Sequence, residues 1–314
     1  MEKQGVAVVF PGQGSQRPGM GKDFYDNILE SRHIYHEASD ALGWDVAAMC
    51  FGGDERLNLT EYAQPCILTT EIAMLRGLHS LYGFSPAFFG GHSLGEYTAL
   101  VAADVLSLPE TLPIVQVRGN LMQEAMPVGV GGMSAIISDD IDAGMIRDTL
   151  KDLPVDVANI NSADQVVISG VLSAMHKAEK LLKDVIKNQI LRFVPLNVSA
   201  PFHSRFMDSI REAFEDALRA LMKMLTPGGA KRVTSNFTGG FHSNNPDEIV
   251  NNLVLQLSNT VKWRDNMYAL SSRADEIYEI GPTRPLRSFF KTIDVTCSPI
   301  TTLSAAKRVF ERNL

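Results

Sequence analysis

A serine motif flanked by glycines constrains the fold of this chain more than any other feature. The segment Gly91-His92-Ser93-Leu94-Gly95 has the form GxSxG, follows the apolar run Ala87-Phe88-Phe89 and leads into a helical stretch that reaches Ala102. The two glycines let the backbone turn sharply enough to present a serine above a sheet, at the start of a helix. The pattern predicts a strand, a tight turn and a helix, with Ser93 as the candidate nucleophile. A plain strand-to-helix turn is the alternative interpretation.

The rest of the chain alternates between apolar runs and segments of helical periodicity, which is typical of an α/β fold. Buried strands are predicted at Val6–Phe10 and Glu276–Ile280, and a polar loop is predicted around residues 235–246. Helices are predicted at Pro65–Leu78, Met207–Met224 and Glu248–Leu257. Pro65 suits the first turn of its helix.

A different pattern fills the middle of the chain. It predicts strands Met133–Ile137, Val155–Ile160, Gln165–Ser169 and Ile190–Leu196, with helices Asp140–Lys151 and Leu172–Lys187. This βαββαβ order is the ferredoxin-like plan. We expect residues 129–199 to form an inserted subdomain, and residues 1–128 and 200–314 to form the main α/β unit.

A serine nucleophile needs a base, and the histidines after Ser93 are His176, His203 and His242. His176 lies in a charged amphipathic segment and His242 in a polar loop beside two glycines, so both are expected to be exposed. His203 lies at a break between a predicted strand and helix, where loops present catalytic groups, and is the preferred base. A packing or capping role for His203 is the alternative. Because hydrolase triads end in a late histidine, and none follows residue 242, an ordinary lipase or esterase is disfavoured.

The loop after the first strand supplies a candidate oxyanion donor. Gln13 stands between Gly12 and Gly14, and its side chain could act together with the backbone N–H of Leu94. A plain glycine-rich turn is the alternative. The loop lacks the lysine of a P-loop and the spacing of a dinucleotide motif, which disfavours nucleotide binding.

Composition excludes several classes of protein. The 314 residues are 45% hydrophobic and carry a net charge of -7, which disfavours a nucleic-acid surface. The three cysteines are far apart and form neither a zinc pattern nor a disulfide framework. We find no export signal and no apolar run of about 20 residues, so we expect a soluble, cytoplasmic protein without membrane segments.

Eight ordered segments together resemble one family. They read FPGQGSQRPGMG, AQPCILTTE, GHSLGEYTAL, VRGNLMQEA, NINSADQVVISG, APFHSRFM, LQLSNTVKW and YEIGP, and extend from about residue 5 to about residue 290. The chain is similar in these segments to malonyl-CoA:acyl carrier protein transacylases. The resemblance implies an α/β-hydrolase-like core with the ferredoxin-like insertion. It also implies transfer of malonyl from malonyl-CoA to the phosphopantetheine thiol of an acyl carrier protein through an ester on Ser93, without a metal or another cofactor.

The resemblance also assigns site residues, motif by motif. Ser93 would be the nucleophile, and His203 the general base and acid. Arg118 would bind the malonyl carboxylate with two parallel hydrogen bonds. Gln13 and the Leu94 amide would form the oxyanion hole, and the main-chain carbonyl of Gln256 would orient the histidine. Two further assignments complete the set: Asn161 and Gln165 would border the cleft, and Phe202 would leave little room for a methyl branch.

Two positions depart from the family pattern, and several alternatives stay open. Asp104 replaces a small residue or glycine, and Thr283 stands where a glycine usually follows Pro282. Fatty-acid and polyketide pathways are both possible. An acyl hydrolase that clears carrier proteins, and an inactive scaffold that docks them, are the rival functions; the presence of Arg118 disfavours the first, and the complete set of Ser93, Arg118 and His203 disfavours the second.

Overall fold

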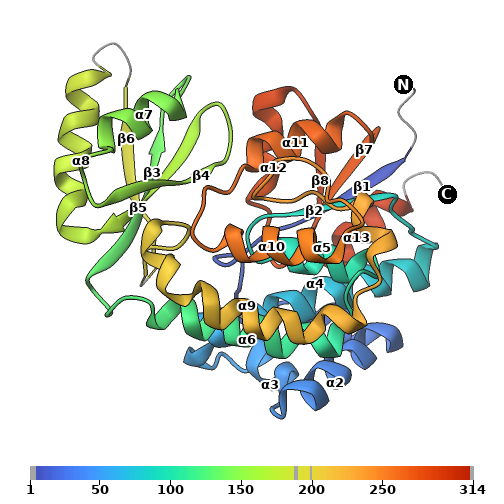
Figure 1. The fold of residues 1–314 in the computed structure, drawn as a ribbon. Helices are drawn as coiled ribbons and strands as arrows, with labels where there is room; N and C mark the ends of the chain where they lie inside the picture. Colours follow the sequence, from blue (N-terminus) through green and yellow to red (C-terminus); the bar gives the residue numbers. More distant parts are fainter. Residues whose placement is uncertain (1–4, 187–189, 199, 312–314) are drawn as a thin grey trace.

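A four-stranded parallel sheet forms the centre of the larger unit (Figure 1). A computed structural model describes residues 5–186, 190–198 and 200–311. The strands lie in the order β2 (Phe88–Gly91), β1 (Val6–Phe10), β7 (Glu276–Ile280) and β8 (Cys297–Ile300), and all three pairs are parallel. Strand β1 is central and almost wholly buried, which explains its uninterrupted apolar sequence. Its predicted bounds and those of β7 are confirmed.

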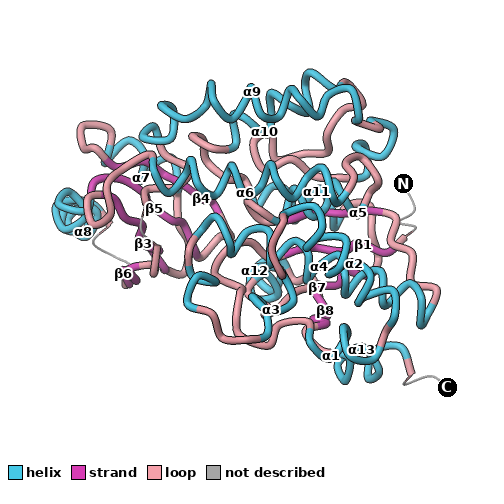
Figure 2. The backbone as a smooth tube through the Cα atoms, turned by 90° about the horizontal axis from the view of Figure 1, so that it is seen from below, coloured by secondary structure: helices cyan, strands magenta, loops and turns pink. Residues whose placement is uncertain are grey.

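Helices surround this sheet, as the tube in Figure 2 shows. They are α1 (Lys22–Asn27), α2 (Leu29–Leu42), α3 (Val46–Phe51), α4 (Thr60–Tyr82), α5 (Gly95–Ala102), α6 (Leu108–Glu124), α9 (Arg211–Leu221), α10 (Pro246–Gln256), α11 (Trp263–Ser271), α12 (Leu286–Phe290) and α13 (Leu303–Phe310), with short 3-10 turns at Glu55–Asn58, Arg205–Ile210, Met222–Met224, Pro227–Arg232 and Lys291–Ile293. None of the helices in the described residues is long and apolar enough to cross a membrane.

The start of α4 corrects one prediction. The helix begins at Thr60, so Pro65 lies inside it rather than in its first turn. The added turn is polar, yet Thr60 and Gln64 are buried because their side chains point toward the site described below. Apolar periodicity could not reveal a helical turn whose buried face is polar.

The segment after His203 is also less regular than predicted. Instead of one helix over Met207–Met224, the chain forms a 3-10 turn at Arg205–Ile210, then α9, then a second 3-10 turn at Met222–Met224. Both helix types bring residues three apart to the same side, so the apolar spacing does not distinguish them.

The second unit is a four-stranded antiparallel sheet with its own apolar core, drawn in green and yellow in Figure 1. Its elements are β3 (Gly131–Ile137), α7 (Ala143–Leu150), β4 (Val155–Ile160), β5 (Gln165–Val171), α8 (Leu172–Val185) and β6 (Arg192–Pro195). The strand order β4-β5-β3-β6 is that of a ferredoxin-like fold. The division at residues 129 and 199 stays a prediction. Residue 199 and the predicted end of α8 at residue 187 lie outside the described residues.

A short backbone bridge joins the two units. Asn159 in β4 pairs in parallel with Val261, and the N–H groups of Ile160 and Val261 donate across the junction at 2.9 Å and 2.8 Å. These bonds hold the end of β4 against the segment between α10 and α11. The site described next lies beside this junction.

The backbone conformation at Asp104 accounts for one departure from the family pattern. Its backbone is left-handed, with φ 58°, just beyond the end of α5. Glycine adopts this conformation without strain, and aspartate is among the few other residues that tolerate it.

Candidate active site

Ser93 lies on a sharp turn between β2 and α5, as the GxSxG pattern predicts. Its backbone is left-handed, with φ 54°, and its flanking glycines lie against other backbone. A Cβ on Gly91 would lie 2.0 Å from the carbonyl carbon of Gly95, and a Cβ on Gly95 would lie 2.2 Å from the Phe10 oxygen. Only glycine fits at either position, so the motif is required by the packing of the turn.

Asn236 holds this turn from the other side. Its Oδ1 accepts a 2.6 Å hydrogen bond from the Ser93 N–H, and its Nδ2 donates to the Gly91 carbonyl at 2.7 Å. One buried side chain therefore replaces the two backbone partners that the sharp turn does not provide. No local sequence pattern marks Asn236 as part of the site.

The structure brings His203 to Ser93. The Ser93 Oγ lies 2.8 Å from His203 Nε2, and His203 Nδ1 donates to the Gln256 carbonyl at 2.8 Å. The second bond places the proton on Nδ1 and leaves Nε2 free to accept one. Burial, and then the charge of Arg118, lower the pKa of His203 to about 3. The imidazole is thus neutral at pH 7, as a general base must be.

Arg118 projects from α6 into the same site and is 1% exposed. Its Nη2 donates to Ser93 Oγ at 3.0 Å and to Gln256 Oε1 at 2.9 Å, and its Nη1 donates to Gln64 Oε1 at 2.8 Å. The guanidinium also lies 5.2 Å from the centre of the Tyr97 ring. No ion pair among the described residues includes Arg118. A buried cation without a direct anionic partner favours an incoming carboxylate.

The two predicted oxyanion donors come from different segments, the start of α5 and the loop after β1. Leu94 immediately precedes α5, so its amide belongs to the first helical turn, where N–H groups lack intrahelical acceptors. Gln13 donates from Nε2 to Thr60 Oγ1 at 3.1 Å and accepts from Gln64 Nε2 at 3.4 Å. Gln64, another residue absent from the predicted site, thus links Gln13 to Arg118.

A cavity of about 100 Å³ opens between the two units at Ser93. It is lined by Gln13, Gln64, His92, Ser93, Arg118, Met122, Met133, Asn159, Leu196, Val198, Phe202 and His203. Phe202 lies on its wall, and its effect on a methyl branch stays a prediction. The lining combines a buried cation and other polar groups with apolar side chains, which suits a small ligand with one charged end.

Asn161 contacts His92, one of the residues that line the cavity. Its Oδ1 is 2.8 Å from His92 Nε2, and its Nδ2 donates to Gln165 Oε1 at 2.8 Å. The predicted subdomain residues Asn161 and Gln165 therefore reach the site through His92, which lines the cavity.

His242 was predicted to be exposed, and this prediction is wrong. Its side chain is buried, with Nε2 2.8 Å from Glu96 Oε1. The polar loop folds back at a bridge between Thr234 and Phe241 and carries His242 onto α5. The local signal for this pair was Glu96 itself, because it is the only charged residue in α5, all of which is described. His176 is exposed, as predicted.

A nucleophile elbow with a serine–histidine pair, on an α/β fold, defines a class of enzymes that act on acyl groups through serine. Comparison with known proteins identifies the family. The acyl transferase domain family matches residues 7–281, so the chain belongs to this family and is an acyltransferase.

Named relatives confirm the resemblance to malonyl-CoA:acyl carrier protein transacylases. The malonyl CoA-acyl carrier protein transacylase of Bacillus subtilis strain 168 is 36% identical over 296 residues, which cover 92% of this chain and 90% of the relative. That of Staphylococcus aureus strain MRSA252 is 35% identical over 313 residues, covering 96% and 97%.

Solved structures agree in fold. The Clostridium perfringens malonyl CoA-acyl carrier protein transacylase has a TM-score of 0.89 at 33% identity, covering 99% of this chain and 97% of the other. A malonyl-transacylase in complex with a type II PKS acyl-carrier protein has a TM-score of 0.87 at 31% identity, covering 99% and 100%. The expected α/β fold class is confirmed.

Proposed function

We propose that this enzyme transfers malonyl from malonyl-CoA to the phosphopantetheine thiol of an acyl carrier protein, through a malonyl ester on Ser93. One observation carries the proposal. The Ser93 Oγ lies 2.8 Å from the Nε2 of a neutral histidine and 3.0 Å from a buried guanidinium. Nucleophile, base and a cation suited to a carboxylate thus meet at one cavity. The names of the relatives, and the solved complex with a carrier protein, support the same substrates.

The first half-reaction forms the ester. His203 Nε2 takes the Ser93 proton as Oγ attacks the thioester carbonyl, and the oxygen of the tetrahedral intermediate receives hydrogen bonds from the Leu94 amide and Gln13. The carbon–sulfur bond then breaks, and His203 returns the proton to the sulfur of coenzyme A. Gln256 keeps the Nδ1 proton in place throughout.

The second half-reaction follows the same chemical steps in reverse, with a different thiol. His203 removes the proton of the phosphopantetheine thiol, the sulfur attacks the ester carbonyl, and Ser93 Oγ leaves and regains the proton. No metal or redox cofactor takes part in these proposed steps.

Arg118 supplies the selectivity. A malonyl carboxylate in the cavity would receive hydrogen bonds from Nη1 and Nη2, which donate to neutral oxygens without a substrate. Acetyl offers no such group. Phe202 and the methionine side chains of the wall restrict a branched acyl group.

Intact-protein mass spectrometry after mixing with malonyl-CoA tests the proposal. We expect an increment of about 86 Da, the mass of an acyl-serine ester of malonate. Ser93→Ala should abolish the adduct and the transfer, while the exposed Ser288→Ala should retain both. An adduct on Ser93→Ala would place the nucleophile elsewhere. Rapid hydrolysis of malonyl-CoA without carrier protein would instead support the hydrolase.

A further inference from the structure

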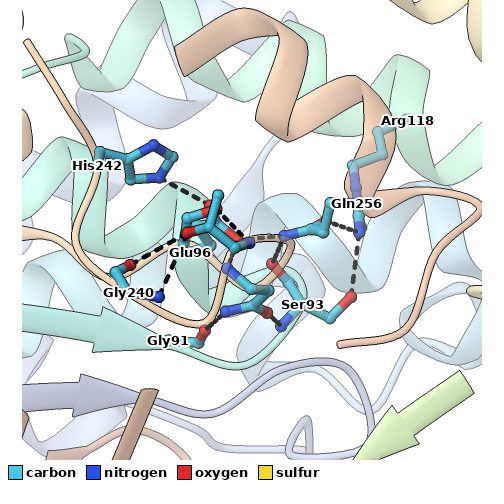
Figure 3. A network of polar contacts seen from close by, with 10 residues as sticks. Gly91, Ser93, Glu96, Arg118, Gly240, His242 and Gln256 are labelled. Atoms are coloured by element: carbon cyan, nitrogen blue, oxygen red, sulfur yellow. Dashed lines mark hydrogen bonds and ion pairs between the residues drawn. The ribbon is translucent and has the colours of Figure 1, made fainter. Parts of the chain in front are cut away.

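Glu96 is a buried carboxylate at the centre of the polar network behind Ser93 (Figure 3). Its Oε1 contacts His242 Nε2 at 2.8 Å, and its Oε2 accepts from Gln256 Nε2 at 2.6 Å and from the Asn236 N–H at 2.9 Å. The side chain of Glu96 does not line the cavity, and its hydrogen bonds go to His242, Gln256 and Asn236 rather than to the side chains of Ser93, His203 or Arg118. It contacts the residues that hold them.

The contacts of Glu96 fix the orientation of the Gln256 amide. A carboxylate only accepts hydrogen bonds from these donors, and a guanidinium only donates. Gln256 lies between the two, with Nε2 toward Glu96 and Oε1 toward Arg118 Nη2 at 2.9 Å. A flipped amide would point its N–H groups at the guanidinium and its oxygen at the carboxylate. Glu96 therefore determines which end of Gln256 faces Arg118.

The same residue connects Glu96 to the base and to the nucleophile. The main-chain carbonyl of Gln256 accepts the Nδ1 proton of His203 at 2.8 Å, and its Nε2 also donates to the Ser93 carbonyl at 3.1 Å. Asn236, held at its N–H by Glu96, clamps the turn at Ser93. Nucleophile, base and arginine thus share one anchoring carboxylate.

We propose that Glu96, held in place by His242, is a positioning residue for malonyl transfer, because it fixes the Gln256 amide that orients Arg118 and thereby sets the preference for malonyl. This inference rests on the proposed function. A structural role alone is the competing explanation, since a buried hydrogen-bonded pair can also serve only to hold the loop at residues 235–246 onto α5.

Glu96→Gln separates these explanations, because it keeps the shape of the side chain and removes its restriction to accepting. The Gln256 amide can then adopt either orientation. We expect the single-turnover rate constant for acylation by malonyl-CoA to fall roughly 10- to 100-fold, as for misplaced catalytic groups. Acylation by acetyl-CoA should change less, so the malonyl-to-acetyl ratio should fall. Glu71→Gln is the matched control, since Glu71 is another buried carboxyl, bonded to Thr98 of α5, and should leave this ratio unchanged.

The double variant Glu96→Gln/Gln256→Glu exchanges the carboxylate and the amide, and so tests whether it matters which of the two groups faces Arg118. It restores one carboxylate–amide pair but places the carboxylate against Arg118, where it competes with malonyl. Positioning predicts a further loss of the malonyl-to-acetyl ratio. A structural role predicts recovery of both thermal stability and the ratio, which would overturn the proposal.

If Glu96→Gln does not fold, variants of His242 test the same proposal about Glu96. His242→Gln keeps a donor near the position of Nε2, and should recover most of the ratio that His242→Leu loses. Wild-type ratios in Glu96→Gln, or in His242→Leu, would overturn the inference. These outcomes require that wild-type enzyme forms the adduct on Ser93; its absence would refute the proposed function instead.

Discussion

Ser93 and His203 meet at 2.8 Å although each has a left-handed backbone, with φ 54° and φ 56°. Neither is a glycine, so each conformation is strained, and such strain persists only where the surroundings determine it fully. The Asn236 clamp does so for Ser93, and the Gln256 carbonyl fixes the ring of His203. The distance between Ser93 Oγ and His203 Nε2, on which the proposed mechanism depends, is therefore set before substrate arrives.

His203→Ala should slow acylation of Ser93 by several orders of magnitude, because the base acts mainly in the transition state. Binding of malonyl-CoA to the variant should survive. Quenched single-turnover reactions followed by mass spectrometry measure the rate constant, and calorimetry measures binding. The exposed His176→Ala is the control and should behave as wild type. A larger defect in His176→Ala would show that the base is misassigned.

The acylation rate constant should vary little between about pH 5 and pH 8. The pKa of His203 is lowered to about 3 by burial and by Arg118, so the neutral base persists as the pH falls. A solvated imidazole of ordinary pKa would lose roughly thirtyfold in its neutral fraction at pH 5. Rate constants measured across this range distinguish the two cases. A midpoint near 6.5 would mean that solvent reaches the ring.

Arg118→Ala should reduce the preference for malonyl-CoA over acetyl-CoA. The carboxylate would lose a buried charged partner, at a cost of roughly 2 to 5 kcal/mol that acetyl does not bear. Arg118→Lys should restore little, because one ammonium cannot form two parallel hydrogen bonds. The ratio of kcat/KM for the two thioesters, with one carrier protein, is the measurement. An unchanged ratio would exclude Arg118 from the site.

Glu279 should make the stability of the fold depend on pH. Burial raises the pKa of this carboxyl to about 7, although the backbone N–H groups of Leu286 and Arg287 oppose the shift. The folded protein then holds a proton that the unfolded chain releases near pH 4.5, so the stabilisation is complete below that pH and is lost as the pH rises through 7. The full effect is at most roughly 3 kcal/mol.

The test for Glu279 is a difference between two proteins. The change in Tm between pH 5 and pH 8 is measured for wild type and for Glu279→Gln, and the difference between the two changes cancels the contribution of other groups. The variant should lose less stability than wild type between the two values. Equal losses in both proteins would show that the carboxylate is already ionised at pH 5.

The sequence predicted the elements whose signal is local. Strands β1, β4 and β7 have their predicted bounds because β1 is an apolar run, β4 and β7 mix apolar with polar residues, and each strand ends at turn residues. Ser93 was identified for a similar reason, since its motif requires glycine at fixed positions. The start of α4 was missed because its first turn buries polar groups, which periodicity reads as exposed.

The network behind Ser93 could not be predicted from local sequence. Glu96 and His242 are 146 residues apart, and Ser93 and Asn236 are 143 apart. Each member alone resembles an ordinary surface residue, and only the fold supplies its partner. A charged residue within the apolar helix after Ser93 was the one local indication that a buried partner exists.

The cavity draws its walls from two separately packed units. Ser93, Arg118 and His203 belong to the larger unit, whereas Met133, Asn159 and Leu196 come from elements of the smaller sheet or its edge. The smaller unit thus supplies part of the wall around the proposed acyl site, whereas the proposed reacting groups all lie on the larger unit. Substitutions in the smaller unit can broaden or narrow the range of substrates while the reacting groups keep their geometry, so acyl-chain preference can evolve separately from catalytic competence.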